Sequence, residues 1–104
     1  AMDYFNDFKA KYEYDPPYQA AESTASVQVY VDAIQRAGSF DTDKIRDALA
    51  ATDLATFYGQ IKFSEAGNNI AKPMVLRQVQ NGKYVAVAPT KFATVPVVYP
   101  RPNF

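Results

Sequence analysis

One long stretch, from about Pro17 or Tyr18 to Ala37, carries apolar residues at helical spacing and constrains the fold more than any other feature. Its apolar stripe consists of Ala20, Thr24, Val27, Val31 and Ile34, widened by Val29, Tyr30 and Ala33. A helix that is apolar over most of its girth is normally covered on two sides. Gly38 is expected to end it as a C-terminal cap. The sequence therefore predicts a long central helix with other elements packed around it.

Two shorter helices are predicted, one before and one after the long one. Residues 4–14 place Phe5, Phe8 and Tyr12 on one helical face, with Asp3 as the expected cap. The Asp15-Pro16-Pro17 sequence should end this helix, because a residue before proline avoids the helical region. Asp41 is a good N-cap for the other helix, expected over residues 42–52 with Ile45 and Leu49 facing inward.

The second half of the chain changes from helical to alternating spacing. Residues 58–63 are expected to form a strand in which Gly59 marks a bulge, and residues 64–73 form a polar loop. Asn81-Gly82 between residues 74–80 and 83–88 predicts a hairpin with a two-residue turn. Its facing pairs would be Gln80 with Lys83, Gln78 with Val85, and Leu76 with Val87. Because both hairpin faces are partly apolar, cover on both sides is expected.

The predicted fold class is α+β, with three helices followed by a small antiparallel sheet of about three strands that includes the Asn-Gly hairpin. At 104 residues the chain is expected to be a single domain, residues 1–104. Residues 90–104 contain Pro96, Pro100 and Pro102, so an irregular proline-rich tail is expected there.

Composition excludes several classes of function. The chain has no histidine and no cysteine, which removes the commonest general base, the commonest metal ligand and thiolate chemistry. Its 11 basic and 11 acidic residues form no basic stripe for nucleic acid. No apolar run is long enough for a membrane span, and no signal peptide is expected within the chain. We therefore expect that the chain is not an enzyme, binds no metal, cofactor or nucleic acid, and does not insert into a membrane.

Few polar residues are candidates for a functional role. Asp41, Asp43 and Asp47 lie at a helix start, where capping explains them better than acid–base catalysis. Glu22, placed in the first turn of the most apolar helix, has two explanations. The positive end of the helix dipole favours a carboxylate there, or the side chain faces a ligand cleft.

An ordered set of short motifs resembles a known family. It comprises Phe8-Lys9-Ala10-Lys11-Tyr12, Pro17-Tyr18-Gln19-Ala20-Ala21, Ala33-Ile34-Gln35-Arg36-Ala37-Gly38-Ser39, Thr56-Phe57-Tyr58-Gly59-Gln60-Ile61-Lys62-Phe63, Lys72-Pro73, Gln78-Val79-Gln80-Asn81-Gly82-Lys83 and Tyr99-Pro100-Arg101-Pro102. Together they resemble the C-terminal portion of type I periplasmic substrate-binding proteins of ABC importers. Within that family, the branched-chain amino acid and amide or urea binders are the most similar group.

The resemblance implies two α/β lobes with a solute held in the cleft between them, a periplasmic location and an ABC permease complex as partner. The solute would be an amino acid, an amide or an aromatic acid. Tyr18 and Glu22 match the stretch that enters the long helix and contributes to the cleft, so they are the expected ligand-binding residues.

The resemblance also implies that this chain is a C-terminal fragment of a larger binding protein. Such a fragment lacks one wall of the cleft and exposes surfaces that the missing lobes would cover, which favours a homodimer. The alternative function is a truncated, self-associating interaction fragment that binds no ligand of its own.

Overall fold

The computed structural model describes residues 1–100, and the chain divides into two compact units. The first unit comprises Ala1–Lys72 and the second begins at Pro73. The sequence suggested one domain over residues 1–104, whereas the contacts along the chain separate at the Lys72-Pro73 bond. None of the helices in the described part is both long enough and apolar enough to cross a membrane.

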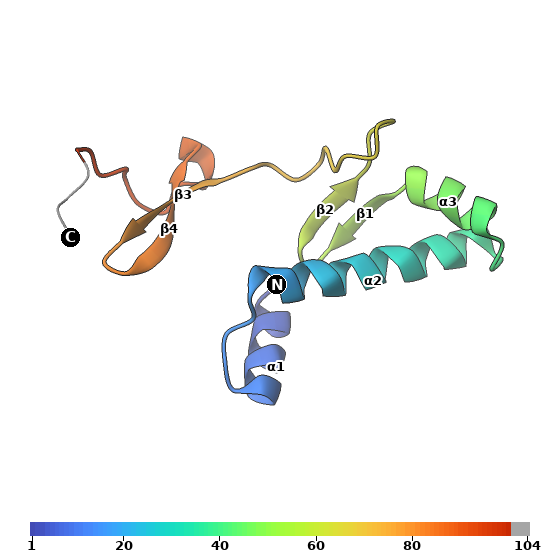
Figure 1. Cartoon of the computed structure of the whole chain (residues 1–104), viewed down its shortest axis with the longest axis horizontal. Coiled ribbons are helices and arrows are strands. Elements are labelled where there is room, and N and C mark those ends of the chain that lie inside the picture. Colours follow the sequence, from blue (N-terminus) through green and yellow to red (C-terminus); the bar gives the residue numbers. More distant parts are fainter. Residues whose placement is uncertain (101–104) are drawn as a thin grey trace. The chain divides into compact units, whose positions relative to one another are not determined.

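The first unit holds the three predicted helices and a short hairpin (Figure 1). In chain order they are α1 (Met2–Tyr12), α2 (Tyr18–Ala37), α3 (Thr42–Ala50), β1 (Asp53–Thr56) and β2 (Gly59–Lys62). Gly38 ends α2 at a φ of 59°, and its N–H donates to the carbonyls of Ile34 and Gln35, as predicted. Asp3 was wrongly predicted as a cap, because α1 begins at Met2 and Asp3 lies within the first turn.

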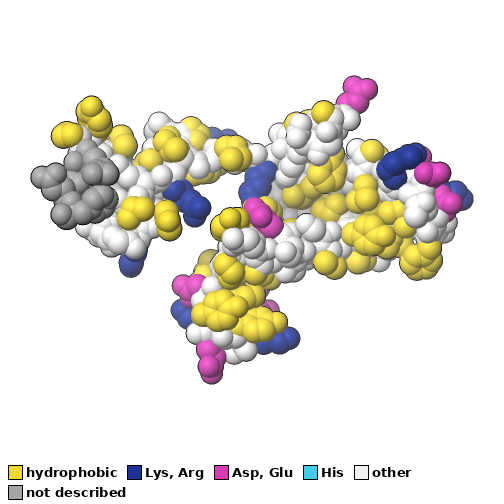
Figure 2. All heavy atoms as spheres, in the orientation of Figure 1, with side chains coloured by type: hydrophobic (Ala, Val, Ile, Leu, Met, Phe, Trp, Pro, Cys, Tyr) yellow, Lys and Arg dark blue, Asp and Glu magenta, His cyan; other side chains and the backbone are white. Residues whose placement is uncertain are grey.

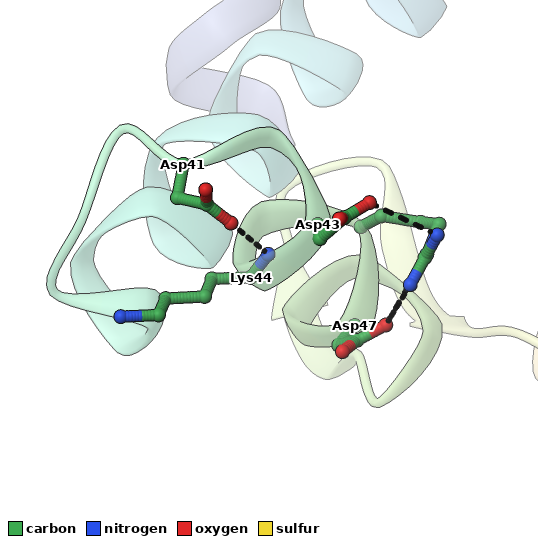
Figure 3. A network of polar contacts seen from close by, with 5 residues as sticks. Asp41, Asp43, Lys44 and Asp47 are labelled. Atoms are coloured by element: carbon green, nitrogen blue, oxygen red, sulfur yellow. Dashed lines mark hydrogen bonds and ion pairs between the residues drawn. The ribbon is translucent and has the colours of Figure 1, made fainter.

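The start of α3 confirms the capping interpretation of its acidic residues (Figure 3). Asp41 Oδ1 accepts a hydrogen bond of 3.0 Å from the backbone N–H of Lys44. Asp43 and Asp47 form ion pairs of 3.2 and 2.9 Å with Arg46, and all three side chains are largely exposed. Exposed pairs of this kind contribute little to stability, so the cluster serves as a helix start and a solvated face.

The core of the first unit lies along one side of α2. Ala25, Val29 and Ala33, spaced four residues apart, are its buried residues, and Ile45 of α3 and Ile61 of β2 are buried with them. The predicted stripe was partly wrong, because Val27 and Val31 are 63% and 46% exposed. Helix α3 and strand β1 both contact α2 (Figure 1). Because they cover α2 on one side, only one row of its apolar residues is buried. Hydrophobic side chains therefore remain on the surface along α2 (Figure 2).

Arg36 joins the end of α2 to the end of α3. Its Nε pairs with Asp32 at 2.8 Å, while Nη1 donates to the carbonyl oxygen of Ala48 at 2.7 Å. Its Nη2 donates to Thr52 Oγ1 at 3.0 Å, and that hydroxyl in turn donates to the same Ala48 oxygen at 3.3 Å. Thr52 is only 2% exposed, so these bonds satisfy a buried hydroxyl and a carbonyl at the C-terminal end of α3.

The two hairpins form separate two-stranded antiparallel sheets, which corrects the prediction of one sheet of about three strands. The predicted strand at residues 58–63 corresponds to β2, and its partner β1 was missed because residues 53–56 directly follow a helix. Gly59 has a φ of 125° and opens β2 rather than forming a bulge. Thr56 Oγ1 donates to the Gly59 carbonyl at 2.8 Å, which closes a tight turn that presents Phe57 and Tyr58.

The second unit contains the Asn-Gly hairpin, formed by β3 (Leu76–Gln80) and β4 (Lys83–Ala88). Asn81 and Gly82 both have positive φ, at 51° and 72°, as the two-residue turn requires. The pairs Gln80 with Lys83 and Gln78 with Val85 are confirmed. Leu76 pairs with Ala88 instead of Val87, because the register shifts by one residue between Leu76 and Arg77.

The rest of the second unit departs from prediction in two ways. A 3-10 helix, η1 (Thr90–Phe92), stands in the tail that was expected to be irregular, and Pro102 lies outside the described residues. Cover on both faces of the hairpin was also expected. Within the described residues, however, Leu76, Val79 and Tyr84 are 64%, 48% and 73% exposed. The alternation of apolar residues thus predicted the strands but not what covers them.

Candidate functional site

The candidate site centres on a hydrogen bond between α2 and the β1–β2 turn. The Tyr58 hydroxyl donates to Glu22 Oε1 at 2.7 Å, although the two residues are 36 positions apart in the chain. Glu22 is exposed in the second turn of α2, and Tyr58 is half-buried because the Thr56–Gly59 turn directs it back toward the helix. The site therefore depends on the packing of the hairpin against α2.

Burial and Glu22 together raise the pKa of Tyr58 to about 12. Burial is the larger cause, since it disfavours the charged phenolate. The hydrogen bond to Glu22 and the negative charge of its carboxylate act in the same direction. The raised pKa keeps Tyr58 protonated well above neutral pH, so the hydroxyl remains a hydrogen-bond donor to Glu22.

Lys72 completes the cluster from the last residue of the first unit. Its Nζ lies over the face of the Tyr58 ring, a cation–π arrangement. Burial lowers the pKa of Lys72, while the nearby charge of Glu22 partly opposes that change. Within residues 1–100 Lys72 forms no ion pair with a carboxylate. A half-buried ammonium is thus held against an aromatic face.

Two hollows adjoin the Tyr58 side chain. The first is a groove of about 480 Å³ between α2 and β2, with polar groups from Glu22, Ser26, Tyr30, Tyr58 and Asn69 and an apolar floor that includes Val29, Ile61 and Phe63. The second is a pocket of about 290 Å³ near α1, lined mainly by Tyr4, Phe5, Pro16, Phe57, Tyr58 and Lys72. Glu22 lines the groove, whereas Lys72 lines the pocket.

A stacked aromatic pair forms one wall of the smaller pocket. The rings of Tyr4 and Phe57 lie 4.3 Å apart between centroids, at 27° between planes. The Tyr4 hydroxyl is 3.3 Å from Thr24 Oγ1, which ties α1 to α2 at this point. The wall is therefore held by stacking and by a polar contact, and it is built from three separate elements.

The two residues expected to bind ligand occupy different surroundings. Glu22 faces the groove, as described above. Tyr18 lies four residues earlier on the same helix, so it shares the helix face of Glu22. It is 60% exposed and lines neither the groove nor the pocket. The structure brings Glu22 together with Tyr58 and Lys72, but not with Tyr18.

Sequence reasoning missed Tyr58 and Lys72 as site residues. An aromatic pair, Phe57-Tyr58, immediately before a glycine is a local signal for a turn that displays both rings. No comparable signal marks Lys72, because its place over Tyr58 results from tertiary packing. The sequence placed Tyr58 in the predicted strand and Lys72 in the polar loop, but it assigned neither residue to a site.

The site offers recognition chemistry. Ser26, one helical turn after Glu22, donates to the backbone carbonyl of Glu22 at 2.9 Å, so it is engaged within the helix. Among residues 1–100, no group of three or more carboxylates is placed to hold a metal ion. A carboxylate, a protonated phenol and an ammonium beside apolar walls suit hydrogen bonding and charge pairing with a small molecule.

Comparison with known proteins identifies the family. Residues 1–83 match the family described as periplasmic binding protein, and the chain therefore belongs to this family. A solved structure with a similar fold is the leucine-binding protein LivK from Thermotoga maritima, with a TM-score of 0.74 and 34% sequence identity. The match covers 85% of this chain and 25% of that protein. The resemblance to type I binding proteins of the branched-chain amino acid class is thereby confirmed.

Proposed function

We propose that this chain contributes part of the solute-recognition surface of a periplasmic binding protein that serves an ABC importer. The solute would be an amino acid, an amide or an aromatic acid, and the partner an ABC permease complex. The observation that carries the proposal is the family match over residues 1–83. The chain spans a quarter of the length of the leucine-binding protein it matches, so the activity of a whole binding protein is part of the proposal.

The chemistry around Glu22 and Tyr18 supports a recognition role. Glu22 is fixed at one oxygen by Tyr58, which limits its rotamers before any solute arrives. Such preorganisation lowers the ordering cost of binding. Tyr18 adds an exposed ring one turn away on the same helix. We propose that both side chains contact the solute, with the groove floor accepting its apolar part.

A ligand screen on this chain tests the proposal. Amino acids, amides, urea and aromatic carboxylates would be titrated while the thermal unfolding midpoint is followed. A ligand that binds only the folded state stabilises it by about 2.7 kcal/mol at a hundredfold excess over its Kd. The Glu22→Gln and Tyr18→Ala variants should each weaken binding. Glu65→Gln, which neutralises an exposed loop carboxylate, is the matched control.

A second candidate function, self-association without ligand, is favoured by the surface of α2. Val27, Tyr30 and Val31 are 63%, 50% and 46% exposed on this helix. Adjacent exposed apolar side chains of this kind favour association, and we propose a homodimer. Sedimentation equilibrium should then show twice the chain mass, and Val27→Glu should lower it, while Gln19→Glu should not. A monomer across the accessible concentration range would rule out this candidate.

A further inference from the structure

The tail of the second unit contacts its own hairpin through two glutamine side chains. Gln78 and Gln80 lie two residues apart on β3, so both side chains extend from the same face of the sheet. Gln78 Nε2 donates to the carbonyl oxygen of Val98 at 2.9 Å, and Gln78 Oε1 accepts from the Val98 N–H at 2.9 Å. Gln80 Nε2 donates to the carbonyl oxygen of Pro96 at 2.9 Å. The two side chains, called here the amide clamp, thus bind the backbone of alternate tail residues.

The amide clamp also has an internal hydrogen bond. Gln80 Nε2 donates to Gln78 Oε1 at 2.7 Å. A side-chain amide has two N–H donors and an oxygen with two lone pairs, so Gln80 Nε2 uses both hydrogens and Gln78 Oε1 uses both lone pairs. Both glutamines are half-buried, whereas Arg77 and Val79 beside them are exposed. The clamp therefore presents two donors and one acceptor to a backbone in a fixed arrangement.

The spacing of the clamp matches an extended chain. Each residue of a strand rises about 3.3 Å, so two amides at this spacing meet tail residues two positions apart when the tail is extended as well. Pro96 and Pro100 favour an extended conformation for the residues before them. Each bond ends on a backbone atom of the tail, while the side chains of Val97 and Tyr99 are 60% and 91% exposed. The clamp thus recognises a backbone and not the side chains of this tail.

The pattern of bonds restricts which segments fit the clamp. At the position of Pro96 the clamp uses a carbonyl oxygen, so a proline is accepted there. At the position of Val98 it uses the N–H as well as the carbonyl oxygen, and a proline there would lose one bond. A fitting segment therefore has an extended backbone with a free carbonyl at one residue and a free N–H two residues later.

We propose that Gln78 and Gln80 form a binding site for an extended peptide segment, which the chain's own residues 96–98 occupy. The partner that fits is a segment of another protein chain with the same backbone pattern, and it binds when the tail leaves the clamp. A tethered tail competes at an effective concentration in the millimolar range, so it inhibits the site from within the chain. The site lies in the second unit, and the inference does not rest on the solute recognition or the α2 association proposed above.

The experiment uses the full chain carrying Val98→Pro, which removes the N–H that donates to Gln78 and so releases the tail. Two-dimensional amide NMR follows the side-chain signals of Gln78 and Gln80, with the backbone signals of β3 and β4 as the check that the hairpin is folded. Gln78→Ala, added to Val98→Pro, removes half of the clamp. Val79→Thr, on the opposite face of the same strand, is the matched control.

The probe is a peptide of residues 94–99, acetylated and amidated so that it carries no charge. A second peptide is N-methylated at the position of Val98 and therefore lacks the N–H that the clamp accepts. A third peptide carries Pro96→Ala and keeps every backbone atom that the clamp binds. The second and third peptides separate recognition of the backbone from adhesion to apolar side chains.

The first peptide should saturably shift the Gln78 and Gln80 signals of the Val98→Pro chain, with a Kd on the order of 1 mM. The N-methylated peptide should bind at least fivefold more weakly, and the Pro96→Ala peptide within about threefold of the first. Gln78→Ala should weaken binding at least fivefold, whereas Val79→Thr should leave it unchanged. The parent chain should bind the peptide at least threefold more weakly, because its own tail competes. Added salt should leave the Kd unchanged, because the bonds join neutral groups.

Several results would overturn the inference. Gln78 and Gln80 signals that stay unchanged in Val98→Pro would show that these amides do not hold the tail. Equal binding of the N-methylated peptide would show adhesion without backbone recognition, and absence of peptide binding would show that the clamp serves the chain's own tail alone. If Val98→Pro lacks native hairpin signals, the parent chain decides. Excess peptide should then displace its tail and move the Val98 amide signal toward that of the free peptide, and an unmoved signal would overturn the inference.

Discussion

Replacing Tyr58 by Phe should produce a pH-dependent change in the stability of the first unit. The substitution removes the hydroxyl that donates to Glu22 Oε1 at 2.7 Å and leaves the ring in place beneath Lys72. Hydrogen bonds to charged groups contribute about 1.5–3 kcal/mol when buried. Since Glu22 is exposed, we expect Tyr58→Phe to lower the free energy of unfolding by about 1 kcal/mol at pH 8.

The pH dependence follows from the raised pKa of Tyr58. In the unfolded chain this phenol ionises near 10.0, and in the folded protein near about 12. The stabilisation is therefore complete below pH 10 and is lost as the pH rises toward 12, because the unfolded state alone releases the proton. With these two values, the parent chain loses about 1.4 kcal/mol between pH 8 and pH 11 through Tyr58 alone.

Urea unfolding followed by far-ultraviolet circular dichroism measures this difference, because all three α-helices belong to the first unit. The parent should be more stable than Tyr58→Phe at pH 8 and should lose that advantage at pH 11. Tyr84→Phe, which removes a 73% exposed phenol from the second unit, should match the parent at both pH values. A parent-minus-variant difference that stays constant from pH 8 to pH 11 would refute the raised pKa and its burial.

Substitutions at four further positions test the core and the capping of the first unit by the same unfolding assay. Thr52→Val should cost about 1–2 kcal/mol, because it leaves one Arg36 donor without its buried acceptor, and a cost near zero would contradict that role. Val29→Ala should lower the free energy of unfolding by about 2 kcal/mol, because it leaves a cavity at a buried position. Val27→Ala, at an exposed position, should lower it by less than about 0.5 kcal/mol. Equal costs would show that Val29 does not lie in the core. Asp41→Ala should cost about 1 kcal/mol through the lost cap, most of it recovered by Asp41→Asn.

The local chemistry of the chain explains which parts of the fold could be predicted. The Asp41 cap, the Gly38 cap and the Asn81-Gly82 turn each depend on the backbone conformation of one or two residues. Such signals lie within a few positions of the structure they specify. The missed strand at residues 53–56 has no such signal, because its conformation follows from pairing with Gly59–Lys62.

The buried face of α2 shows the limit of periodicity more clearly. Several overlapping stripes fit a helix that is apolar over most of its girth, and the sequence contains no rule that selects among them. In the structure, the buried face is the one that carries small residues. Ala25 and Ala33, on either side of Val29, leave room for the neighbouring elements to pack against α2. The larger Val27 and Val31 remain on the outside of the first unit. Apolar periodicity therefore located the helix, whereas its orientation required the shapes of its partners.

The candidate site illustrates the same limit for function. Glu22 had two explanations from sequence, a favourable helix-dipole position or a cleft-facing group, and nothing within its own helix decides between them. The decisive neighbour, Tyr58, is 36 residues away and reaches Glu22 only because a four-residue turn reverses the chain between β1 and β2. Lys72 follows after a further loop and places the opposite charge over the face of the same ring. Tyr58 lines both hollows, while Glu22 lines only the groove and Lys72 only the pocket. Each hollow therefore has its own charge preference, and solutes of opposite charge should bind to different hollows.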